Sequence, residues 1–116
     1  MISISILHNN LDHINGFIVD GHANYSSYGE DIVCASVSTI TIGTVNAIER
    51  FCQVKMQTEV RDGYLKAIIP IDRNDKKGFS KSNHDIQLLL QSMAYTLRDL
   101  EKTYAKHIRI TTKIYN

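Results

Sequence analysis

Alternation of apolar and polar side chains predicts β-strands near both ends of the chain. Residues 2–7, ISISIL, alternate isoleucine with serine, which is the period of two expected of a strand with one buried face. A second strand is expected over residues 14–20, after the turn signal Asn9-Asn10, so that the two strands form a hairpin. The C-terminal segment over residues 107–116, HIRITTKIYN, alternates in the same way and predicts a further strand. Its buried face is expected to carry Ile108, Ile110, Thr112 and Ile114.

The middle of the chain carries a second hairpin signal. In residues 56–71, MQTEVRDGYLKAIIPI, the pair Asp62-Gly63 separates two runs of β-prone residues, and such a pair favours a tight two-residue turn. Pro70 fits the end or the edge of the second run, because a missing backbone N–H does little harm there. Two more strands are therefore expected.

A helical pattern of apolar residues runs through residues 80–105. Steps of three and four place these residues on one stripe of a helix. Ser82 to Asp85 supply side chains that could cap its start. The stripe consists of Ile86, Leu89, Leu90, Met93, Leu97, Leu100 and Tyr104.

The segment over residues 32–51, IVCASVSTITIGTVNAIERF, is ambiguous by propensity. Its β-branched residues favour a strand. Twenty residues without a turn signal are long for a strand, however, and the apolar spacing is helical, so a helix is predicted. Gly43 is expected to weaken this helix by about 1 kcal/mol relative to alanine. The expected stripe consists of Val33, Val37, Ile40, Thr44, Ala47, Ile48 and Phe51.

The predicted order of elements is ββαββαβ, which defines the fold class. Runs of neighbouring strands favour antiparallel pairing, so we expect an α+β fold in which two helices pack on one face of a mainly antiparallel five-stranded sheet. A chain of 116 residues is sufficient for one core and too short for two. Residues 1–116 are therefore expected to form a single domain.

Composition and charge exclude some classes of partner. Hydrophobic residues make up 43% of the chain and charged residues 22%, with a formal net charge of +1, so no broad field of either sign attracts a polyanion. The charged run over residues 72–77 mixes both signs and is expected to be a solvated loop. No direct contact with nucleic acid is predicted.

No membrane segment is expected either. The start of the chain, MISISILHNN, lacks a positive charge ahead of its apolar part, which is too short for the core of a signal peptide. The sequence contains no run of about 18 apolar residues, the length needed to span a bilayer. The expected compartment is the cytoplasm.

The two cysteines, Cys34 and Cys52, are expected to be free thiols. If they lie on one helix, 18 positions separate them by roughly 27 Å, which is too far for a disulfide. They lack the spacing of a zinc site, so neither a metal nor another cofactor is predicted. Cys52 is expected to be a small buried hydrophobe.

Cys34 and His22 are the candidate nucleophile and base. Near the start of a helix, unpaired N–H groups and the helix dipole would favour a thiolate at Cys34, and its own N–H could serve an oxyanion. The segment between Gly21 and Gly29 could bring His22 back toward the thiol, with the glycines as hinges. From the residues alone, a surface loop leading to a structural cysteine is the favoured reading, and the catalytic pair is the alternative.

Asp31 and Ser38 are candidates for supporting roles. Asp31 could orient His22, or it could be the N-cap of the helix. Ser38 follows Cys34 by one turn and could donate to the sulfur or to His22, or bond back to a helical carbonyl. The remaining histidines are expected at the surface: His8, His13, His84 and His107.

A longer pattern surrounds these candidates. It consists of Gly21-His22-Ala23, Gly29, Asp31-Ile32-Val33-Cys34-Ala35, Ser38 and Thr44-Val45-Asn46. In residue type and spacing together, this pattern resembles the bacterial Prp family, the ribosomal-processing cysteine proteases. Ser36 departs from the family's pattern, which more often has alanine or glycine there.

The resemblance implies a specific activity. Family members remove an N-terminal extension from large-subunit ribosomal protein twenty-seven, look like homodimers and need no metal. By position, Cys34 matches the nucleophile and His22 the general base, while Gly21, Asp31 and Ser38 match other motif residues. The implied chemistry is acyl transfer through a thioester. The rival hypothesis is a non-enzymatic ribosome-assembly or protein-interaction module with a structural cysteine.

Overall fold

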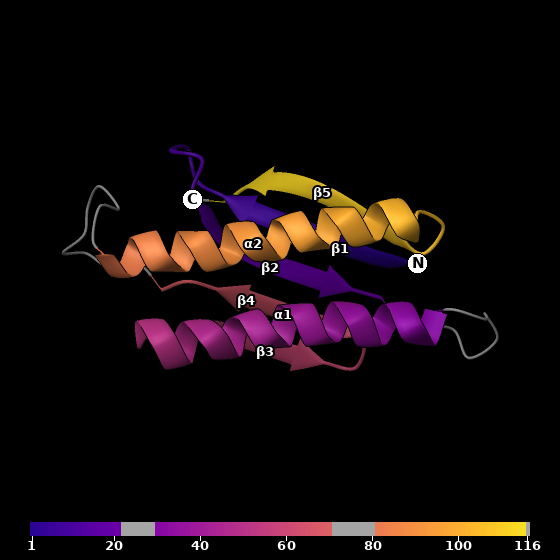
Figure 1. The fold of residues 1–116 in the computed structure, drawn as a ribbon, viewed down its shortest axis with the longest axis horizontal. Helices are drawn as coiled ribbons and strands as arrows, with labels where there is room; N and C mark the ends of the chain where they lie inside the picture. The colour runs from indigo at the N-terminus through magenta and orange to yellow at the C-terminus, as the bar shows by residue number, and fades with distance from the viewer. Residues whose placement is uncertain (22–29, 71–80, 116) are drawn as a thin grey trace.

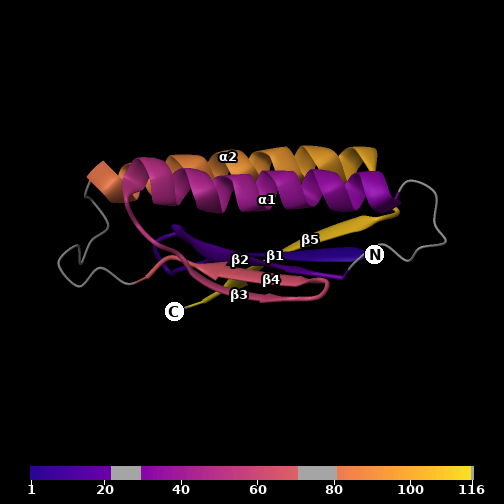
Figure 2. The same ribbon diagram turned by 90° about the horizontal axis from the view of Figure 1, so that it is seen from below.

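The computed structural model describes residues 1–21, 30–70 and 81–115. Two helices form one layer and a five-stranded sheet forms the other, with both helices on the same face of the sheet (Figures 1 and 2). This is the predicted α+β architecture, and the order ββαββαβ is confirmed. The elements are β1 (Ile2–His8), β2 (Ile14–Asp20), α1 (Glu30–Cys52), β3 (Gln57–Arg61), β4 (Tyr64–Ile68), α2 (Lys81–Thr103) and β5 (Ile108–Ile114).

The sheet is mostly antiparallel, with the strand order β3-β4-β2-β1-β5. β1 pairs with β2, β2 with β4 and β3 with β4 in antiparallel fashion, whereas β1 and β5 are parallel. The parallel pair requires a crossover, which α2 supplies. The helices run in opposite directions, α1 over the β3–β4 side of the sheet and α2 over the β1–β5 side (Figures 1 and 2).

The core lies between the helices and the sheet. The isoleucines of β1 point into it, as the alternation with serine predicts. The predicted stripe of α2 is also confirmed, because every member is buried or packs against the buried cluster. Fully buried side chains come from both layers: Ile4, Phe17, Val33, Ile48, Leu90 and Leu97.

α1 is a helix, as its length and spacing predict, although it begins two residues earlier and ends one residue later than expected. Its threonines fit a helix because their hydroxyls donate hydrogen bonds to backbone carbonyls one turn earlier. Thr41, fully buried, donates its hydroxyl to the carbonyl of Val37 at 2.8 Å. The expected place of Phe51 on the buried stripe is wrong: Phe51 is 76% exposed, and Cys52, four residues after Ile48, takes the buried position.

β5 buries only its beginning. Ile108 is buried and Ile110 is half-buried, but Thr112 and Ile114 are exposed, so the predicted buried face is only partly present. Figure 2 shows the reason, because β5 starts beneath α2 and then runs away from the helical layer toward the C-terminus.

The two predicted hairpins have the expected turns. The Asn9 side chain accepts from the N–H groups of Leu11 and His13 at 2.9 and 3.0 Å. Gly63 has a φ of +68°, which fits the tight turn between β3 and β4.

By length and composition alone, Ile32–Cys52 of α1 is apolar enough to cross a membrane. No such segment was expected from the sequence, because serine and threonine residues interrupt its apolar run. Its mean hydropathy is nevertheless high enough. Core helices meet the same criterion, and α1 buries one stripe of side chains against the rest of the core.

Candidate active site

Cys34 lies on the side of α1 that faces the sheet. It is the fifth residue of the helix, it is half-buried, and its side chain packs against the buried core. At about 100° per residue, Cys34 lies within roughly 20° of the fully buried Thr41 on the helix circumference. Cys34 therefore lies on the buried side of α1.

The start of α1 differs from the expectation in a way that affects the site. Because Glu30 is already helical, Asp31 lies in the first turn instead of in front of it, which corrects the N-cap prediction. The ladder of an α-helix also gives the N–H of Cys34 the carbonyl of Glu30 as its acceptor, so this N–H is not a free oxyanion donor. The first turn still presents N–H groups that have no acceptor within the helix, those of Asp31 and Ile32 among them.

Ser38 is exposed one turn after Cys34. Its position is rotated by about 40° from Cys34, away from the buried stripe. One alternative for Ser38 was a hydrogen bond from its hydroxyl to a carbonyl of its own helix. The structure has such a bond at Ser36, whose hydroxyl donates to the carbonyl of Ile32 at 2.8 Å. The serine that departs from the family's pattern therefore bonds within its own helix.

Gly21 fixes the backbone where β2 ends. Its φ of +108° is in the range that favours glycine, and a Cβ placed there would lie 2.4 Å from the carbonyl oxygen of Met1. Its N–H donates to the carbonyl of Gly63 at 2.8 Å, which ties the end of β2 to the β3–β4 turn. The backbone leading into residue 22 is thus held by two other parts of the chain. His22 and Gly29 themselves lie outside the described residues.

The bond between Gly21 and Gly63 was not predicted from the sequence. The Asp62-Gly63 signal located the hairpin, but it gave no indication that β4 would lie next to β2. The order of the strands, which depends on long-range pairing, is what brings the turn to the site.

Cys52 is a buried structural thiol. It is 8% exposed, and burial, followed by the charge of the Asp85 carboxylate, raises the pKa of the Cys52 thiol. A thiol with a raised pKa is a poor nucleophile at neutral pH. Both cysteines are free, as predicted.

The described histidines lie elsewhere. His8 and His13 flank the β1–β2 turn. There the Nδ1 atom of His8 lies 3.9 Å from the carboxylate oxygen Oδ1 of Asp12. His84 is exposed near the start of α2 and contacts Asp85 at 3.3 Å. Over residues 1–21, 30–70 and 81–115, no cluster of three or more His, Cys, Asp or Glu side chains is arranged to hold a metal ion.

A surface hollow is lined by residues that follow Cys34 in the sequence, but it lies on the side of α1 opposite to Cys34. It lies between the two helices, and its α1 residues are rotated from Cys34 by about 170° on average. This hollow is therefore not in line with the thiol. It is lined by Ala35, Ser36, Thr39, Ile40 and Leu100.

A half-buried thiol near the start of a helix that covers one side of an α+β sheet is a candidate nucleophile, which fits the class of thiol hydrolases. The family described as cysteine protease Prp matches residues 1–109. A curated relative, the ribosomal processing cysteine protease Prp of Staphylococcus aureus (strain Mu50), is 34% identical over 114 residues, which cover 97% of this chain and 100% of the relative. This chain belongs to the Prp family and is a cysteine protease.

Solved structures agree with this assignment. The essential ribosomal processing protease Prp from S. aureus in complex with a substrate peptide superposes with a TM-score of 0.82 at 32% identity, covering 97% of this chain and 100% of that chain. The same enzyme with a covalently linked product peptide gives a TM-score of 0.78 at 32% identity over the same shares.

Proposed function

We propose that this protease removes the N-terminal extension of large-subunit ribosomal protein twenty-seven during ribosome maturation. The observation that carries the proposal is the difference between its two thiols: Cys34 is only half-buried near the start of α1, whereas Cys52 is buried. The relatives named above are ribosomal processing proteases, and the solved ones hold a substrate or product peptide.

In the proposed reaction Cys34 is the nucleophile. Its thiolate attacks the scissile carbonyl carbon, His22 protonates the leaving amine, and a thioester links the substrate to the enzyme. His22 then takes a proton from water, which attacks the thioester and releases the acid product. Asp31 and Ser38 support these groups. The hinge role expected of Gly21 gives way to an anchoring role, because its backbone is tied to Gly63. Gly29 is the proposed hinge of the segment that carries His22.

The developing oxyanion needs donors other than the N–H of Cys34. Helical geometry leaves the N–H groups of Asp31 and Ile32 without an acceptor inside α1, and the positive end of the helix dipole lies in the same turn. We assign the oxyanion to this turn. Neither metal nor cofactor enters the proposed reaction.

The activity is tested with a peptide that spans the extension of the ribosomal protein from the same organism. Wild-type protein is expected to cut it once, as seen by mass spectrometry, and Cys34→Ala and His22→Ala are expected to lose the cleavage. Cys52→Ala is the matched control, since it removes the other thiol of the same helix and should still cut. Uncut peptide with wild type, or equal cleavage by Cys34→Ala, would refute the proposal.

The proposed working form is a cytoplasmic homodimer. Large apolar side chains are exposed on the helices, and a second copy could cover some of them: Ile32, Phe51, Leu88 and Tyr95. Sedimentation at micromolar concentration should give twice the chain mass of 13.2 kDa. A monomer at that concentration would argue against the dimer without affecting the proposed cleavage.

A further inference from the structure

β3 is an edge strand on the side of the sheet that α1 covers. It lies at one end of the order β3-β4-β2-β1-β5, and among the described residues it pairs with β4 alone. All five of its residues, Gln57–Arg61, are exposed. Figures 1 and 2 show that α1, the helix that carries Cys34, passes over this side of the sheet.

A hydrogen bond at the end of β4 determines which backbone groups of β4 face each neighbour. The N–H of Gly21 donates to the carbonyl of Gly63, so these two residues form a hydrogen-bonded pair of the β2–β4 ladder. Hydrogen-bonded and non-hydrogen-bonded pairs alternate along an antiparallel ladder. Leu65 and Ala67 therefore also direct their backbone groups toward β2, where their partners are Val19 and Phe17.

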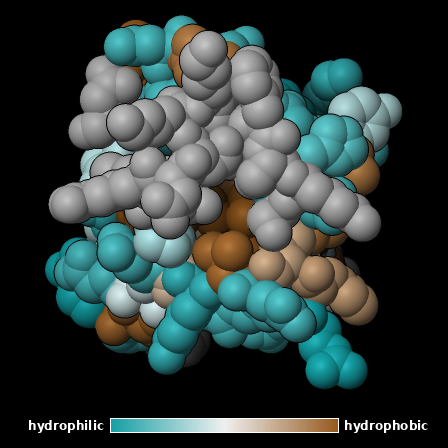
Figure 3. Space-filling model, turned by 90° about the vertical axis from the view of Figure 1, so that its left-hand side faces the viewer, coloured by the Kyte–Doolittle hydropathy of each residue, from teal (hydrophilic) through white to brown (hydrophobic). Residues whose placement is uncertain are grey.

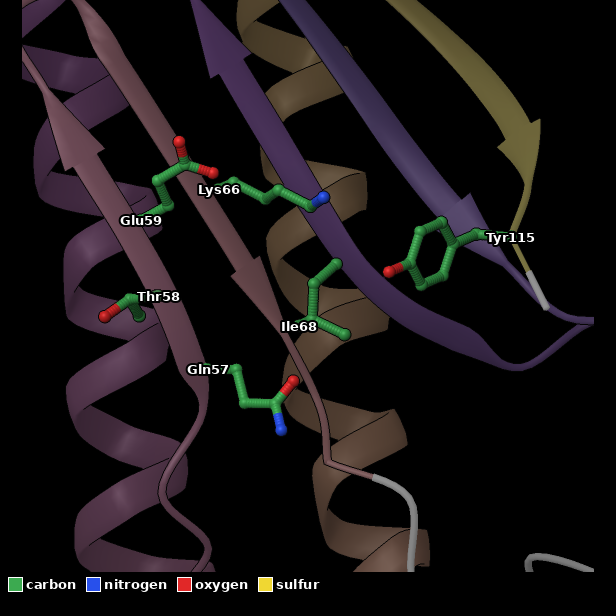
Figure 4. A pocket seen from close by; sticks show the side chains of 6 residues that line it. All are labelled: Gln57, Thr58, Glu59, Lys66, Ile68 and Tyr115. Atoms are coloured by element: carbon green, nitrogen blue, oxygen red, sulfur yellow. The ribbon is translucent and has the colours of Figure 1, made fainter.

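The same alternation leaves two residues of β3 with free backbone groups. Thr58 and Val60 are opposite Ala67 and Leu65, whose N–H and C=O groups point to β2. The N–H and C=O groups of Thr58 and Val60 thus point out of the sheet, at its open edge. In Figure 4 the side chain of Thr58 also points to the side of β3 away from β4.

The two faces of this edge differ in chemistry. Val60 is opposite Leu65, which packs against the core, so Val60 lies on the helix-covered face, and it is 72% exposed. The outer face carries a polar hollow of about 200 Å³ instead (Figure 4). Its lining residues are Gln57, Thr58, Glu59, Lys66, Ile68 and Tyr115. An occupant of the edge therefore meets the exposed apolar side chain of Val60 on the helix-covered face.

We propose that the substrate peptide binds as an added strand on the edge of β3, an inference that rests on the proposed protease function. The free N–H and C=O groups of Thr58 and Val60 form main-chain hydrogen bonds with it, and the Val60 side chain contacts an alternate side chain of the peptide. An extended chain is the occupant that fits, because a row of unpaired strand groups matches another strand. The bond being cut then lies between this strand and α1.

Proline at residue 60 tests the strand addition. The N–H that proline removes faces solvent, so Val60→Pro leaves the β3–β4 ladder intact. We expect kcat/KM for the extension peptide to fall by about tenfold or more, the effect of losing one or two hydrogen bonds. Alkylation of Cys34 by iodoacetamide should keep its rate. Val60→Thr, which alters the contacting side chain but retains the N–H, is the matched comparison and should cut faster than Val60→Pro.

A second measurement does not depend on the proline variant folding. In Cys34→Ala protein, amide hydrogen exchange of Thr58 and Val60 should slow when the uncut peptide is added, whereas Glu59, already bonded to β4, should not change. Wild-type cleavage together with unchanged exchange, or a Val60→Pro variant that cuts like wild type, would overturn the edge site and leave the protease function intact. Absence of cleavage by wild type would instead count against the function.

Discussion

The two ends of α1 present the same chemical group in two environments. Cys34 and Cys52 are 18 residues apart, or about five turns, so they lie on the same side of one helix. Cys34 is half-buried near the end of the helix where β2 stops, and Cys52 is buried at the end where α2 begins (Figure 1). In the space-filling view of that second end, apolar atoms gather in a patch near the centre, with hydrophilic side chains around it (Figure 3).

This comparison shows that the helix face does not decide the role of a cysteine. Both thiols are on the buried stripe by spacing. The neighbours differ: the turn that carries Cys34 follows a segment anchored at Gly21, whereas Cys52 has the Asp85 carboxylate and core side chains around it. One end of the helix is therefore built for access and the other for packing.

The largest expected difference between the two ends is in thiol reactivity. Iodoacetamide should modify Cys34 in the folded protein at least about 100-fold faster than Cys52, since Cys52 reacts only through opening events that cost a few kcal/mol. The raised pKa of Cys52 acts in the same direction. Timed alkylation followed by peptide mass spectrometry measures both rates.

The control for this measurement is the unfolded chain. In concentrated urea the two thiols should react at similar rates. Comparable rates in the folded protein would contradict the contrast between the two ends of α1.

Next in size is the effect of a methyl group at Gly21. Gly21→Ala should lower the free energy of unfolding by about 1–3 kcal/mol, because alanine is strained at this positive φ. Its Cβ would also displace the Met1 carbonyl. Since residue 22 follows directly, peptide cleavage should fall as well. Urea denaturation and cleavage assays on the same preparation measure the two effects, and a variant of wild-type stability and activity would contradict the anchoring role.

A serine in place of Cys52 tests the packing at the C-terminal end of α1. Cys52→Ser should cost about 1–3 kcal/mol of unfolding free energy, because the serine hydroxyl loses water where apolar side chains surround it. Cleavage per folded molecule should not change. Cys52→Ala separates lost packing from buried polarity, and it should be less destabilised than the serine variant. A Cys52→Ser protein that is fully folded but inactive would place Cys52 in the chemistry.

Local patterns predicted most of the elements. Isoleucine–serine alternation located β1, the three-four spacing located α2, and Asp62-Gly63 located the β3–β4 turn. α1 was predicted correctly against its β-branched composition, because length and spacing outweigh propensity once threonine hydroxyls bond within the helix.

What the sequence did not reveal depends on distant contacts. The bond from Gly21 to Gly63 exists because β4 lies beside β2, and no local pattern contains that order. The earlier start of α1, which moves Asp31 and the N–H of Cys34 into the helix, was not predicted from the apolar spacing either. The roles of His22, Gly29, Asp31 and Ser38 stay predictions.

Gly43 provides the smallest test of the comparison, because it lies between the two ends of α1. It is exposed, and a Cβ added there would meet nothing within 4 Å. Gly43→Ala should therefore raise the free energy of unfolding by about 0.5–1 kcal/mol through helix propensity alone. If the access end is independent of helix stability, cleavage and Cys34 alkylation should stay at wild-type rates. A stabilised variant with slower cleavage would show that the Cys34 end depends on flexibility in the middle of α1.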